Sequence, residues 1–189
     1  MKDIFAKWEF VHRGVRFEAR TYPDYEAAPP WVRGDWHGPV RSAHDAAEKR
    51  PGERVLHRLN GHSIWLYDWQ AACKLARTED WDAEPHGAPN RIERAVQADF
   101  DYLRGWAKGD WEYVGVSVVR LGQDDEFEHA LWGVESSDTA YLRTVATELA
   151  DDAIYPLVEA WKERLAAGRI AHNWARLAAV QAAVLQPST

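Results

Sequence analysis

The chain has 189 residues, 46% of them apolar, which is enough to bury the core of one domain. It carries 30 acidic and 23 basic side chains, and the net charge of -7 opposes simple electrostatic binding to DNA or RNA. A single cysteine excludes an internal disulfide framework, and no apolar run approaches the ~18 residues of a membrane span. Since the N-terminal residues also lack the apolar stretch of a signal peptide, these features predict a cytoplasmic protein without membrane contact.

Three pairs of segments in which apolar and polar residues alternate predict antiparallel β-hairpins. They lie in residues 7–20, 53–68 and 111–135. The middle pair contains Asn60-Gly61, which suits a two-residue type I′ turn and pairs Leu59 with His62. Between the first two hairpins, residues 21–52 are rich in Pro and Gly and predict a long irregular segment, of a kind that is often functional.

Apolar residues at helical spacing predict helices at residues 69–81, 91–108, 139–155 and 169–185. In the first of these, Cys73 falls on the apolar stripe and is expected to be buried. Pro156 is expected to kink or divide the long helix that follows Asp138. The pattern predicts an α+β fold, with an antiparallel sheet built from hairpins and packed by helices. Residues 1–155 would form this α+β domain, and residues 156–189 a helical C-terminal extension.

The motifs of phosphate-binding loops, dinucleotide folds and esterase elbows are missing from the sequence. His57 and His62 would lie on one face of the middle hairpin, near enough to share a metal, but the pattern offers no third ligand. We therefore expect no metal and no cofactor. Asp35 and His37 flank Trp36 and could form an acid–base couple, although a structural loop explains the same residues better.

The strongest charge feature is a tract from Gly122 to Tyr155 with nine acids and one base, Arg143. Such a tract is often only a solvated face, but it can also attract a basic partner. Trp161 and Trp174 lie among alanines on the C-terminal helices and are candidates for a partner or dimer contact. The candidate partner-binding residues are Asp124, Asp125, Glu126, Glu128, Asp138, Asp151, Asp152, Trp161 and Trp174.

Five segments of the chain resemble a family of small uncharacterised proteins encoded by tailed bacteriophages and prophages. They are APPWVRGDWHGPV, KRPGERVL, WLYDWQAACKLARTEDW, DWEYVGVSVVRL and LWGVESSDTAYL, within residues 25–154. The chain departs from the family where Asp35-Trp36-His37-Gly38 replaces the more usual Asp-Gly-His-Gly. The resemblance implies a phage setting and carries no activity with it.

Setting and charge together suggest a non-enzymatic accessory protein that binds a host macromolecule in the bacterial cytoplasm through its acidic surface. The target would have a basic surface, as in a CRISPR effector or a restriction system, whose groove normally holds nucleic acid. A homodimer through the C-terminal helices is a further expectation. The alternatives are a small metal-dependent or acid–base enzyme that uses Asp35, His37, His57 and His62, and a nucleic-acid-binding protein.

Overall fold

The computed structural model describes residues 4–34, 36–59, 63–82, 89–123 and 127–184, with side chains up to residue 177. The fold is α+β, with seven strands in two antiparallel sheets and a long C-terminal helix, as the sequence predicts. Packing divides the chain into two compact units. Unit 1 contains residues 1–22, 115–131 and 140–189, and unit 2 contains residues 23–114 and 132–139. The sequence-based division at residue 155 stays a prediction.

The larger sheet has four strands in the order β1-β2-β6-β7. They are β1 (Ala6–His12), β2 (Val15–Pro23), β6 (Tyr113–Arg120) and β7 (Ala130–Glu135). The first hairpin forms as predicted, because Arg13 and Gly14 both adopt the positive φ of a two-residue primed turn. β6 is buried at every position up to Val119, so both of its faces are covered and not only the one that carries its valines.

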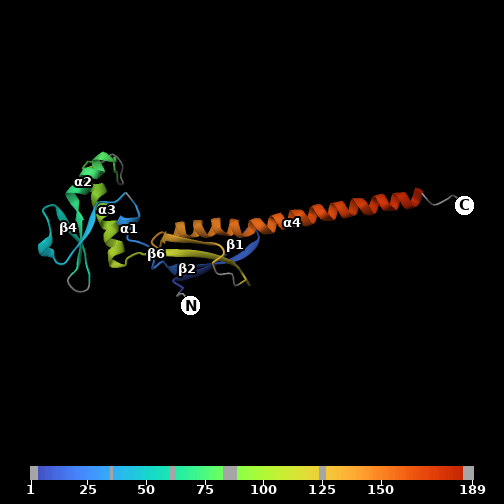
Figure 1. Cartoon of the computed structure of the whole chain (residues 1–189), viewed down its shortest axis with the longest axis horizontal. Coiled ribbons are helices and arrows are strands. Elements are labelled where there is room, and N and C mark those ends of the chain that lie inside the picture. Colours follow the sequence, from blue (N-terminus) through green and yellow to red (C-terminus); the bar gives the residue numbers. More distant parts are fainter. Residues whose placement is uncertain (1–3, 35, 60–62, 83–88, 124–126, 185–189) are drawn as a thin grey trace. The chain divides into compact units, whose positions relative to one another are not determined.

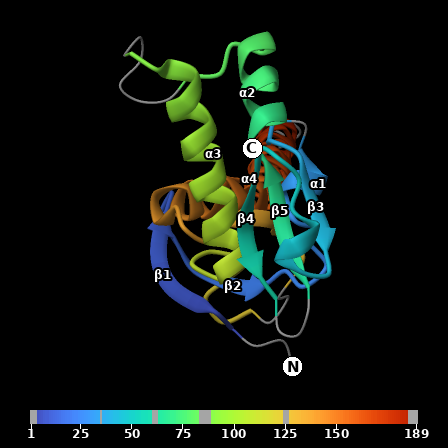
Figure 2. The ribbon, with the colours of Figure 1, turned by 90° about the vertical axis from the view of Figure 1, so that its left-hand side faces the viewer.

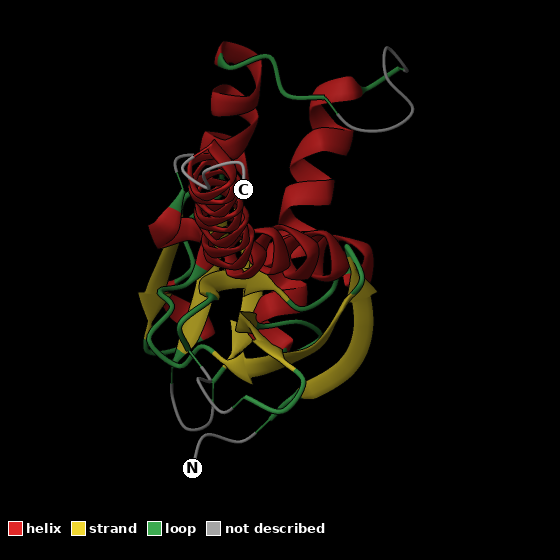
Figure 3. Ribbon diagram, turned by 90° about the vertical axis from the view of Figure 1, so that its right-hand side faces the viewer, coloured by secondary structure: helices red, strands yellow, loops and turns green. Residues whose placement is uncertain are grey.

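The helix α4 (Thr139–Val184) lies along the sheet in unit 1 with its first turns (Figures 1 and 3). Leu142, Val145, Ala146, Ala150 and Ile154 form its buried stripe, whereas Tyr141 is exposed. Pro156 does not divide the helix, and the two helices expected on either side of it are one. Proline removes one backbone hydrogen bond, and the neighbouring turns retain theirs.

The smaller sheet, in unit 2, has the order β3-β5-β4. Its strands are β3 (Val40–Ala43), β4 (Glu53–Arg58) and β5 (Ile64–Asp68). The short α1 (Pro30–Arg33) and a 3-10 turn (Ala46–Glu48) lie in the segment expected to be irregular. β3 was not predicted, because four residues after Pro39 are too short for a periodic signal.

The register of the middle hairpin differs from the prediction. Val55 pairs with Leu66 as expected, but a bulge follows, and His57 then pairs with Trp65. The Leu59 amide bonds to the Ser63 carbonyl, so three residues separate the paired ends where we expected two. The bulge adds one residue to β4 and turns His57 away from the face that carries Ile64 and Leu66.

Two helices cover one face of this sheet (Figure 2). They are α2 (Trp69–Thr78), whose N-terminus is capped by the Asp68 carboxylate, and α3 (Arg91–Lys108), which ends at Gly109 with positive φ. Their contacts with the sheet form a core of Leu56, Tyr67, Ala72, Ala76, Val96, Phe100 and Leu103. Cys73 is only half-buried, against our expectation.

Candidate functional site

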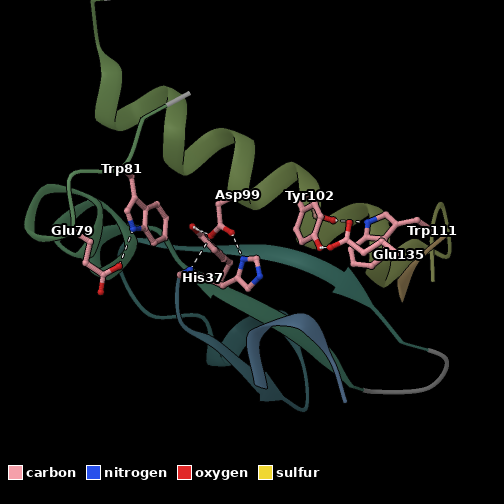
Figure 4. Close-up of polar contacts among 9 residues, drawn as sticks. His37, Glu79, Trp81, Asp99, Tyr102, Trp111 and Glu135 are labelled. Carbon is pink, nitrogen blue, oxygen red and sulfur yellow. Dashed lines mark hydrogen bonds and ion pairs between the residues drawn. The ribbon is translucent and has the colours of Figure 1, made fainter. Parts of the chain in front are cut away.

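The carboxylate of Asp99, on α3, connects three other residues of unit 2. Its Oδ1 lies 2.6 Å from Nδ1 of His37, and its Oδ2 accepts hydrogen bonds from the Gly38 amide at 2.8 Å and the Tyr67 hydroxyl at 2.7 Å (Figure 4). The Asp99 side chain is only 8% exposed. A carboxylate only accepts hydrogen bonds, so Nδ1 of His37 carries a proton here. Asp99 thereby fixes the position of the loop that bears His37.

Two neighbours tighten this arrangement. Burial, followed by the charge of Asp99, raises the pKa of Tyr67 well above its usual value, so the tyrosine remains a hydrogen-bond donor. Gly38 passes so close to this ring that a Cβ there would lie 2.3 Å from the Tyr67 hydroxyl oxygen. Glycine is therefore required at residue 38 for the loop to reach Asp99.

Tyr102 extends the site by one helical turn, because residues three apart on α3 share a face. Its ring stacks on His37, with centroids 5.4 Å apart and planes 12° apart, and its centroid lies 4.7 Å from that of the Trp111 ring. The Tyr102 hydroxyl donates to Glu135 of β7 (Figure 4). Burial, together with this bond, raises the pKa of Tyr102. The His37 ring is thus held by its hydrogen bond to Asp99 and by stacking on the ring of Tyr102.

These residues form one wall of an open cleft of about 580 Å³. It is lined by Trp36, His37, Trp81, Asp82, Ala95, Ala98, Asp99, Tyr102 and Glu135. Trp36 is 75% exposed, and the indole nitrogen of Trp81 donates to Glu79. Among the described residues that line the cleft, three carry carboxylates and none is Lys or Arg. The cleft is therefore suited to a cationic or hydrogen-bond-donating group.

His37 gives the cleft a group that can exchange protons. With Nδ1 engaged by Asp99, Nε2 is the ring nitrogen that can reach a ligand. An oriented carboxylate fixes the tautomer of a histidine ring, so that its other nitrogen can act as a proton acceptor. The expected carboxylate partner, Asp35, lies outside the described residues, and the structure assigns that role to Asp99.

Only one histidine of the pair considered for a metal lies within the described residues. His57 lies beside Trp65, with ring centroids 6.1 Å apart, and His62 is outside the described residues. Within the described part of the chain, no three His, Cys, Asp or Glu side chains are placed to hold a metal ion.

The acidic residues of the predicted tract fall in both units. Glu128 and Asp152 are exposed in unit 1, and Asp138 is exposed in unit 2; Asp124, Asp125 and Glu126 lie outside the described residues. Asp151 bonds to His12 and Arg13, and these contacts lower the pKa of its carboxyl.

The two C-terminal tryptophans proposed as partner contacts are also exposed. Trp161 is 61% exposed and Trp174 is 68% exposed, both on α4.

No helix in the described ranges is both long enough and apolar enough to cross a membrane.

Sequence reasoning missed Asp99, Tyr67, Tyr102 and Glu135 as members of the His37 site. Asp99 and Tyr102 lie on α3, a helix that the sequence predicts, next in sequence to its buried residues Phe100 and Leu103.

Comparison with known proteins adds no relative, since no family model, curated protein or solved structure matches the chain.

Proposed function

We propose that this protein binds a basic region of another macromolecule, and that the cleft beside His37 receives one of its cationic side chains. The composition of the cleft carries the proposal. Its described lining combines aromatic rings with the carboxylates of Asp82, Asp99 and Glu135, without a Lys or Arg. An anion would be repelled by this negatively charged lining, whereas a cation would be attracted to it.

An arginine side chain fits this lining best. Its planar guanidinium can stack on an exposed indole such as that of Trp36 while its N–H groups donate to carboxylates. A cation over an indole is stabilised by about 0.5–2 kcal/mol, depending on how far it is desolvated. The cleft would thus supply orientation and selectivity within a larger interface.

The wider setting suggests the partner. The resemblance to phage proteins favours a host target in the bacterial cytoplasm, such as a CRISPR effector or restriction enzyme with a basic groove. Exposed acids on each unit, among them Glu128, Asp138 and Asp152, would add long-range attraction to such a surface. A homodimer through α4 is the other partner expected from the sequence, and its test is given with α4 below.

Arginine and its neutral isostere citrulline provide the sharpest test of the cleft. We expect N-acetyl-arginine amide to shift the indole NMR signals of Trp36 and Trp81 in a saturable way, and the citrulline analogue to leave them unchanged. Trp36→Ala should abolish the saturable shift of Trp81. Asp82→Asn should weaken binding several-fold, whereas Asp101→Asn, an exposed acid on α3 that does not line the cleft, should have no effect. Equal binding of citrulline would contradict a cation site.

Capture from a bacterial host tests the larger claim. The tagged chain is expected to retain a stoichiometric protein at low salt and to release it at high salt, because exposed ion pairs are screened. Asp82→Asn with Trp36→Ala should reduce the captured amount, whereas Asp101→Asn should not. Recovery of nucleic acid alone would contradict the proposal and support the nucleic-acid alternative.

The His37–Asp99 pair favours a second candidate, acid–base catalysis. Asp99 orients the ring through Nδ1 at 2.6 Å, and Nε2 would act as the base within the cleft. A panel of ester, amide and phosphodiester substrates should then reveal a hydrolytic activity. His37→Gln should abolish it without changing the circular dichroism spectrum. Activity that survives in His37→Gln would eliminate this candidate.

A further inference from the structure

Beyond Tyr155, α4 carries a series of exposed apolar side chains. They are Leu157, Val158, Trp161, Leu165, Ile170, Trp174 and Leu177, all exposed. A stable helix in water normally packs such side chains against another surface. This part of α4 therefore has the composition of an interaction surface, although its apolar side chains are exposed to solvent while the helix is continuous.

The apolar residues form two stripes with opposite directions. Val158, Trp161 and Leu165 are spaced by three and four residues, and Ile170, Trp174 and Leu177 by four and three. Each triplet occupies one side of a helix, but at 100° per residue the second triplet points about 150° away from the first. One flat surface, or one straight helix of a second copy, could cover only one of the two stripes.

The two stripes match each other when the chain reverses between residues 167 and 168. Three apolar pairs then lie at equal distances from the turn, Leu165 with Ile170, Trp161 with Trp174, and Val158 with Leu177. The charges follow the same symmetry, because Glu159 is placed opposite Arg176 and Glu163 opposite His172. Apolar residues thus meet apolar ones, and acids meet basic or ionisable ones.

The midpoint has the residue that a turn needs. Gly168 follows Ala166-Ala167, and a Cβ added to Gly168 would meet no atom within 4 Å, so packing in the continuous helix does not require glycine there. Glycine is among the weakest helix formers and readily adopts the left-handed conformation that ends helices. Antiparallel helices are commonly joined by two to five residues.

We propose that residues 169–177 fold back onto residues 157–165, so that the occupant of this surface is the chain's own C-terminal segment in an antiparallel helical hairpin that turns at Gly168. The continuous α4 is the open form of this segment. In the open form Val158 and Leu177 are about 28 Å apart along the helix axis. In the hairpin they belong to helices with axes about 8–10 Å apart.

Disulfide trapping distinguishes the two forms. In a Cys73→Ala background, Val158→Cys with Leu177→Cys should form an intramolecular disulfide under mild oxidation, visible as a faster-migrating monomer on non-reducing gels. Tyr155→Cys with Trp174→Cys has the same separation of 19 residues but does not match across the turn, so it should remain reduced. A disulfide between two chains, or none in the matched pair, would overturn the proposal; the former would identify a second copy as the occupant.

Gly168→Ala gives an independent measurement. Alanine should favour the continuous helix by about fivefold over glycine, which corresponds to the ~1 kcal/mol difference in helix propensity. The rate of intramolecular disulfide formation in the matched pair should fall by the same factor. An unchanged rate would exclude Gly168 as the turn.

Discussion

The hydrogen bonds of Asp99 allow a quantitative prediction for Asp99→Ala. The substitution leaves three donors without their acceptor, His37 Nδ1, the Gly38 amide and the Tyr67 hydroxyl. Tyr67 and Gly38 are buried, so water cannot replace the carboxylate for them, whereas His37 is partly accessible. With about 1–3 kcal/mol for each stranded donor, the free energy of unfolding should fall by about 4 kcal/mol.

Two further variants separate the possible causes of that loss. Tyr67→Phe removes one donor together with its need for an acceptor, so it should cost only about 1 kcal/mol. Asp99→Asn keeps a carbonyl oxygen for Tyr67 and Gly38 but turns an N–H toward His37. The ring then accepts at Nδ1 and carries its proton on Nε2. This variant should remain folded with the opposite histidine tautomer.

Urea unfolding followed by tryptophan fluorescence measures the stabilities, and ¹⁵N NMR of the His37 ring reports the tautomer. Our reasoning would be refuted if Asp99→Ala cost no more than Tyr67→Phe, because the buried donors would then have found other partners. An Asp99→Asn protein with the native tautomer would show that Asp99 does not orient the ring.

Three other predictions concern unit 2. Because the pKa of Tyr67 is raised, the folded state keeps a proton that the unfolded state loses above pH ~10. The free energy of unfolding should therefore fall as the pH rises above ~10, and it should fall less in Tyr67→Phe. Equal slopes of the two proteins in alkaline urea titrations would contradict this prediction. Gly38→Ala should lower the unfolding midpoint and disturb the His37 ring signals, because its Cβ would collide with Tyr67; a native-like spectrum would disprove the close approach. The buried Glu53 carboxylate pairs with Arg41 and has a lowered pKa. Its stabilising contribution should therefore be present above pH ~4.3 and disappear at lower pH, and Glu53→Gln should lack this loss of stability in acid. The same dependence of stability on acid pH in both proteins would count against the ion pair.

Sequence by itself determined the features that depend on near neighbours. The turn at Arg13-Gly14, the cap by Asp68 and the helix Arg91–Lys108 were all predictable, because positive φ, capping and helical periodicity act over a few residues. The α+β class followed from the same local signals.

Only the tertiary structure decided which distant groups meet. His37 and Asp99 are 62 residues apart, and no periodic pattern connects a loop histidine to the polar edge of a helix. A bulge after Val55 shifts the hairpin register, and Leu56 at the bulge is buried in the core between the sheet and the helices. Packing energies of this kind depend on contacts between remote segments, and the order of residues along the chain records them only indirectly.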